Sequence, residues 1–215
     1  SYLGTETSFR YDDKGQLWLK TEGDMVDIDL FYTVSVIREV ELFGEWVPFM
    51  RSVSLVKQLD FSRLCTHFSV GVRGILVRDC VLRVSACNSA LSDGSLYFEG
   101  RSPEQETWCG AQLPERCQGF AFDRMEVLAL NARIQFIGPN SQHCKIVCAV
   151  DLRLSVPRSL LDFFLKRLVG VFLILWRRHS RQIAENPECK HRRAIDTDTE
   201  FYKEFLYPKY LEFLD

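Results

Sequence analysis

Hydrophobic and polar residues alternate along much of the chain between residues 52 and 155, which is typical of strands with one buried face. In the segment 144–155 the even positions are apolar, whereas Lys145, Asp151 and Arg153 occupy the opposite face. Runs of strand length, rich in β-branched and aromatic residues, lie at 52–61, 64–72, 79–88, 94–101, 126–138 and 144–155. Because turn residues separate these runs, we predict an antiparallel sheet.

The segments on either side of these strands predict a hairpin and two helices. Short strand-like runs at 8–12 and 16–21 flank a turn containing Gly15. Apolar residues at helical spacing predict a helix from about residue 28 to 40, with Asp27 or Asp29 as its N-cap. A second helix is predicted over 157–185, with Ser155 as its cap and Pro157 in its first turn.

The second predicted helix is apolar on nearly every side, so it needs partners on more than one face. Its longest uncharged run, residues 168–176, is nine residues long, against about 20 for a membrane span. A long apolar helix after an antiparallel sheet predicts an α+β helix-grip fold, in which a curved sheet wraps around the C-terminal helix. A cavity between sheet and helix would be apolar with a few polar groups.

Composition and charge narrow the function further. The chain has 215 residues, 47% of them hydrophobic and 26% charged, which excludes a disordered or fibrous protein. Its net charge of −2 argues against a nucleic-acid partner, because such proteins usually carry a basic surplus. We expect one ligand-binding domain over residues 1–186, followed by a C-terminal tail extension over 187–215.

Cysteine and histidine patterns predict no metal site and no cofactor. Eight cysteines are spread without a CxxC pair, and the nearest zinc candidate is His143 and Cys144 with Cys148. Several cysteines lie within apolar runs, so we expect free thiols in a reduced, cytoplasmic protein. No nucleophile or phosphate-loop motif is present, and His67 lies mid-strand. We therefore expect a protein that is not an enzyme.

Two segments resemble START domains, the steroidogenic-acute-regulatory-related lipid-transfer family. Residues 37–49 contain Glu41-Leu42 followed by Trp46-Val47-Pro48, as the family's helix-to-strand segment does. Residues 150–157, followed by Leu160-Leu161 and Phe163-Phe164, are similar to its last strand and lid helix. The resemblance covers residues 9–183, without counterparts of the family's N-terminal helix and first strand, and the tail has no match.

The resemblance implies that the protein binds a phospholipid or sterol between sheet and helix, for intracellular transfer or sensing. The residues expected to line the cavity are Trp46, Phe68, Arg83, Phe98, Leu128, Leu130, Ile134, Val150, Leu152, Leu154, Leu161, Phe164, Leu165, Leu168 and Phe172. Arg83 is the candidate partner of a polar headgroup, with a solvent-facing or salt-bridged arginine as the alternative. Trp46 either lines the cavity mouth or plugs the core.

The C-terminal third of the chain contains basic and aromatic residues that indicate a partner and alternative functions. Arg177, Arg178 and Arg181, with a basic patch at 190–193, suggest transient peripheral contact with anionic membranes, or simply a solvated helix end. Protein partners are not indicated by any motif. Two other functions remain open: a helix-grip enzyme acting on a hydrophobic substrate, and an interaction module with a filled interior that docks a partner through the aromatic tail at 201–213.

Overall fold

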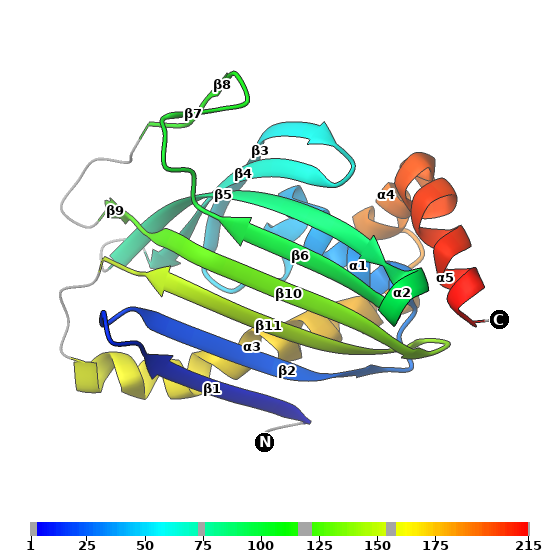
Figure 1. Ribbon diagram of the computed structural model, residues 1–215, viewed down its shortest axis with the longest axis horizontal. Coiled ribbons are helices and arrows are strands. Elements are labelled where there is room, and N and C mark those ends of the chain that lie inside the picture. The colour runs from blue at the N-terminus through cyan, green and yellow to red at the C-terminus, as the bar shows by residue number, and fades with distance from the viewer. Residues whose placement is uncertain (1–3, 73–75, 116–121, 154–157, 215) are drawn as a thin grey trace.

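A large antiparallel sheet dominates the computed structural model, which describes residues 4–72, 76–115, 122–153 and 158–214 (Figure 1). The strand order is β1-β2-β11-β10-β6-β5-β4-β3, and the short β9 pairs in parallel with β5. The strands are β1 (Thr5–Tyr11), β2 (Leu17–Val26), β3 (Met50–Asp60), β4 (Arg63–Val72), β5 (Leu76–Ser89), β6 (Ser95–Arg101), β9 (Phe122–Arg124), β10 (Glu126–Gly138) and β11 (Ser141–Asp151).

The predicted α+β helix-grip fold is confirmed, because this sheet curves around a long C-terminal helix, α3 (Arg158–Glu185) (Figure 1). Both predicted N-terminal strands and all six runs between residues 52 and 155 form strands. The expected caps at Ser155 and Pro157 lie outside the described residues. Within those residues, no helix combines the length and the apolar run needed to cross a membrane.

The first helix is shorter than the sequence predicted. Asp29 caps it by accepting a hydrogen bond from the backbone N–H of Phe31 at 2.7 Å, so α1 spans Leu30–Arg38. Asp27, the other cap candidate, has a positive φ of 57° and precedes the helix. The chain then tightens into the 3-10 helix η1 (Val40–Glu45), which brings Trp46 back toward α3.

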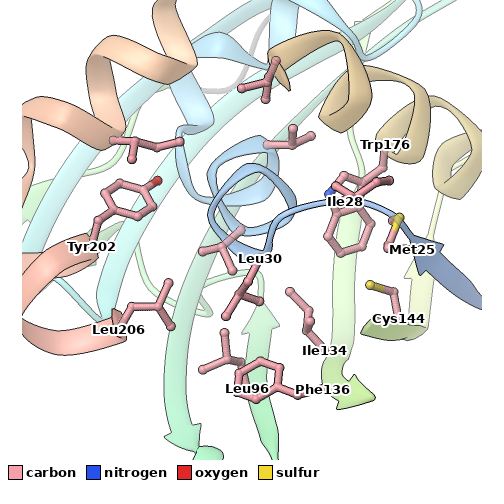
Figure 2. Packing of buried hydrophobic residues seen from close by; sticks show 14 of the residues in the cluster. Met25, Ile28, Leu30, Leu96, Ile134, Phe136, Cys144, Trp176, Tyr202 and Leu206 are labelled. Carbon is pink, nitrogen blue, oxygen red and sulfur yellow. The ribbon is translucent and has the colours of Figure 1, made fainter. Parts of the chain in front are cut away.

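One end of the sheet's inner face forms the core of the protein with α1 and the second half of α3 (Figure 2). Met25, Ile134 and Cys144 are fully buried there. Trp176 of α3 is also buried, and its indole N–H donates to the carbonyl of Thr33 at 2.9 Å. This bond satisfies the polar atom of a large buried aromatic residue and fixes α3 to α1.

The C-terminal segment extends this core. It forms α4 (Lys190–Thr197), a π-helical turn η2 (Glu200–Leu206) and α5 (Tyr207–Leu214), which lie at one end of the sheet (Figure 1). Phe201, Tyr202 and Leu206 are buried in the same cluster as α1. The Tyr202 hydroxyl donates to Glu39 at 2.8 Å. The segment therefore completes the hydrophobic core of the domain.

The segment between β6 and β9 packs on part of the outer face of the sheet. This segment contains a two-stranded hairpin, β7 (Thr107–Trp108) and β8 (Ala111–Gln112). Leu113, beyond this hairpin, packs on Cys65 and Val81 of the outer face. The short helix α2 (Ala90–Asp93) connects β5 to β6 and lies against α5.

Candidate functional site

The inner face of the sheet changes from fully buried to half-buried along its strands. Register places side chains in rows across β11, β10 and β6, and the row Cys144, Ile134 and Leu96 is at most 5% exposed. The next two rows toward the other end are half-buried. They are Ile146, Ala132 and Phe98, then Cys148, Leu130 and Gly100. This second region is therefore an apolar wall that its neighbours cover only in part.

The apolar wall, defined here as Phe98, Leu130, Ala132, Ile146 and Cys148, carries no charged side chain. Its polar group is the Cys148 thiol, whose pKa is raised to about 11 by burial. A neutral thiol is a poor nucleophile at physiological pH, because the thiolate is the reactive form. The wall is thus suited to contact with an apolar ligand.

The first half of α3 runs along the same end of the sheet as the apolar wall (Figure 1). Four predicted cavity residues, Leu161, Phe164, Leu165 and Leu168, belong to this half, and their side chains lie outside the described residues. Leu154 also lies outside them. The candidate site is therefore described at side-chain level on the sheet side alone.

Five other predicted cavity residues share the inner face. Phe98 and Leu130 belong to the apolar wall, and Val150 continues it along β11 opposite Leu17. Phe68 lies on β4 between Val53 and Cys80 and is half-buried. Ile134 is fully buried in the core, in the row of residues next to the apolar wall.

Leu128 and Leu152 lie where the regular ladder ends. A register shift between Val127 and Ala129 makes Leu128 an extra residue in β10. Leu152 follows the last residue of β11, and its carbonyl accepts a hydrogen bond from Arg78 at 2.9 Å.

Arg83 lies on the outer face of the sheet. It is paired with Cys65 of β4 and Arg101 of β6, and Cys65 packs under Leu113 on the side away from α3. The expectation that Arg83 meets a headgroup inside the cavity is corrected by this register. The sequence grouped Arg83 with Val81 and Ser85 on one face, and both of these positions also face outward.

Trp46 and Phe172 fill the space between η1 and α3. Their ring centroids are 4.9 Å apart, and Phe43 stands 5.6 Å from Trp46 on the other side. Trp46 is only 7% exposed. Of the two alternatives for Trp46, this packing favours the core plug.

Comparison with known proteins depends on structure alone. No protein-family model and no curated protein matches the sequence. Human STARD10 superposes with a TM-score of 0.73 at 14% identity, covering 98% of this chain and 79% of that one. Human StAR-related lipid transfer protein 5 gives 0.69 at 16% identity, covering 85% of this chain and 84% of its own.

This chain has the START fold. The likeness confirms the architecture that residues 37–49 and 150–164 suggested. The fold alone leaves the chemistry open, because the Zhui aromatase/cyclase from Streptomyces sp. R1128 matches with a TM-score of 0.51 at 10% identity, over 78% of this chain and 94% of that one. Both binding proteins and enzymes thus occur among matches to this START fold.

The START fold of this chain also creates a basic groove beside α3. Arg177, Arg178 and Arg181 line it opposite Asp24 and Val26 of β2, and its volume is about 700 Å³. Burial lowers the pKa of Arg177, and the neighbouring Arg181 adds to this effect. The lining also includes Glu185, so the groove has three arginines against two carboxylates and a net positive charge.

One cluster of candidate metal ligands in the described residues has no signal in the sequence. Glu45, His179 and His191 offer ligand atoms that lie within 4.8 Å of one another. They come from η1, α3 and α4, so no local spacing in the sequence signals them. The zinc candidate that the sequence offered is divided between the two faces of the sheet. His143 pairs with Asp24 on the outer face, whereas Cys144 and Cys148 lie on the inner face.

Proposed function

We propose that this chain binds a hydrophobic ligand, a phospholipid or a sterol, between the apolar wall and the first half of α3. The observation that carries the proposal is the half-buried, uncharged apolar wall on a face whose other end is fully packed. Covering about 300 Å² of acyl chain would contribute roughly 7 kcal/mol at about 25 cal/mol per Å². That gain is sufficient to hold a lipid away from water without bond chemistry.

We further infer that the protein transfers or senses this lipid and is not an enzyme. Leu82, Val84 and Ala86 extend the inner face on β5, and none of them ionises. In this proposal residues 1–186 form the ligand-binding unit, and residues 187–215 are an extension that stabilises one end. The basic groove supports transient contact with anionic lipid headgroups during loading and release.

A substitution that fills the proposed site tests this function. Ala132→Trp places an indole in the middle of the apolar wall, between Ile146 and Phe98. The matched control is Asn131→Trp, one residue away on the same strand, at an exposed position on the outer face. Each purified protein is incubated with vesicles of phosphatidylcholine, phosphatidylserine and cholesterol, re-isolated, and analysed by native mass spectrometry.

We expect one lipid per chain on the wild type and on Asn131→Trp, and a strong loss on Ala132→Trp. We also expect Ala132→Trp to keep most of its stability, because the ring enters open space. If the interior is filled, the same ring would cost about 1–3 kcal/mol or more by overpacking. An unloaded wild type together with a destabilised Ala132→Trp would favour the interaction module, and a chemically altered lipid would favour the enzyme.

A further inference from the structure

Three side chains from separate elements converge beside Trp46 at the junction of η1, α3 and α4. They are Glu45, His179 and His191, with ligand atoms within 4.8 Å of one another. The two imidazole centroids are 5.0 Å apart, at an interplanar angle of 72°. The Trp46 indole stacks on His179 at 6.4 Å and 22°, which restricts the plane of that ring.

The histidines of this cluster have unused polar atoms. His191 is 1% exposed, and within the described part of the chain neither of its ring nitrogens makes a hydrogen bond of normal geometry. The Nε2 atom of His179 is also buried without a partner. Buried polar atoms in folded proteins almost always have a partner, because an unpaired one costs about 1–3 kcal/mol. A neutral imidazole carries one lone pair, so an ion between the two rings could accept one lone pair from each of them.

The protonation state suits such a ligand. Burial lowers the pKa of His191 to about 4, and the neighbouring His179 adds to the shift. The charge of Glu45 and the backbone of Ser35 oppose it. Burial also lowers the pKa of His179, against the opposing effects of Gln182 and Glu45. Burial therefore favours the neutral imidazole, which is the form that binds a metal ion.

We propose that Glu45, His179 and His191 bind a divalent transition-metal ion, with Zn²⁺ as the best match. Two imidazole nitrogens and one carboxylate oxygen form a donor set that Zn²⁺ accepts, with a water in the fourth position. Tetrahedral ligands about 2.0–2.2 Å from the ion lie about 3.3 Å from one another. Side-chain rotations bring atoms that now lie within 4.8 Å to that spacing.

The surroundings of Glu45 allow this coordination. Its Oε1 atom pairs with Lys190 Nζ at 2.7 Å, and Oε2 remains available to the ion. The Lys190 side chain is 68% exposed, so it can withdraw into water when the ion binds. The bound ion would join α4 to α3 and η1, and this site is independent of the proposed lipid-binding function.

Metal titration of the chelator-stripped protein tests the proposal. The variants Glu45→Gln, His179→Gln and His191→Phe each remove one ligand, and His143→Gln is the matched control because His143 lies on the outer face beside Asp24. We expect one Zn²⁺ per chain in the wild type and the control, and at least tenfold weaker binding in each ligand variant. Circular dichroism verifies that the variants fold.

Two outcomes would overturn the proposal. The first is Zn²⁺ binding that is unchanged by Glu45→Gln and by His179→Gln. These two variants test the proposal even if the variant at the buried position, His191→Phe, fails to fold. The second is binding through thiols, such as the exposed Cys87 and Cys109. The absorption spectrum of the Co²⁺-loaded protein detects binding through thiols. A thiolate ligand gives an intense near-ultraviolet charge-transfer band, whereas a site of nitrogen and oxygen ligands does not.

Discussion

Gln142 connects the sheet to α1 and to the segment just before it through two buried hydrogen bonds. Its Oε1 atom accepts from the Thr33 hydroxyl at 2.9 Å, and its Nε2–H donates to the Ile28 carbonyl at 3.0 Å. Gln142 and Thr33 are both 0% exposed. Gln142→Met preserves the length of the side chain but leaves the hydroxyl and the carbonyl without partners.

The expected destabilisation follows from these two groups. Each buried polar group left unpaired costs about 1–3 kcal/mol, so we expect Gln142→Met to lose about 3 kcal/mol. Thr33→Val leaves one amide oxygen unpaired and should cost about 1–2 kcal/mol. In the double variant only the Ile28 carbonyl is unpaired. That one group costs about 1.5 kcal/mol, against about 4–5 kcal/mol for the two single losses together, so we expect a coupling free energy of about 3 kcal/mol between Gln142 and Thr33.

Urea unfolding of the wild type and the three variants measures this coupling. Gln142→Met should also lower the Tm by about 6–12 °C, since about 2–4 °C per kcal/mol is usual at this size. Losses in the double variant that equal the sum of the single losses within about 0.5 kcal/mol would refute the reasoning. The hydrogen bond between the two side chains would then contribute nothing to the stability of the domain.

Two further predictions concern the thiols and the basic groove. Burial raises the pKa of Cys80 to about 12 and that of Cys148 to about 11 from 9.0, so unfolding releases protons above pH 9 and the free energy of unfolding falls as pH rises toward 11. Urea unfolding at pH 8.5, 9.5 and 10.5 should give a shallower decline for Cys148→Ala than for the wild type, and parallel declines would contradict this. Arg178→Ala combined with Arg181→Ala should weaken binding to phosphatidylserine vesicles about 30-fold, at about 1 kcal/mol per residue. Co-sedimentation measures this, with phosphatidylcholine vesicles as the control, and an equal loss on both vesicles would show that charge is not the cause.

The strands could be predicted because their signal is local. Alternation in residues 144–155 identified the inner face of β11, from Cys144 to Val150, as the structure has it. The same reasoning failed for Arg83 because both faces of β5 carry apolar residues. Val81 is buried beneath Leu113 on the outer face, whereas Leu82 faces the interior. The outer face is covered by Trp108 and Leu113, and alternation within β5 does not encode that cover.

The metal-ligand cluster lay beyond sequence reasoning for a different reason. In the sequence, β3 to β11 separate Glu45 from His179 and His191, so the three residues come together only after α3 and α4 pack on η1. The extra residue at Leu128 was equally hidden, because a β-bulge changes pairing without changing the apolar pattern. Element types follow from local periodicity, whereas sites formed between distant elements depend on the tertiary fold.

The pairing of β2 with β11 constrains the order in which the protein can fold during translation. Residues 17–26 of β2 can pair only after residues 141–150 of β11 have been made. Pairing between segments so far apart in the sequence slows folding. The core then needs Phe201, Tyr202 and Leu206, which follow all the described strands in the sequence. During translation α1 therefore leaves the ribosome long before the side chains that will cover it. Nascent chains expose this apolar surface until residues 201–206 have been made, and exposed surface of this kind promotes aggregation.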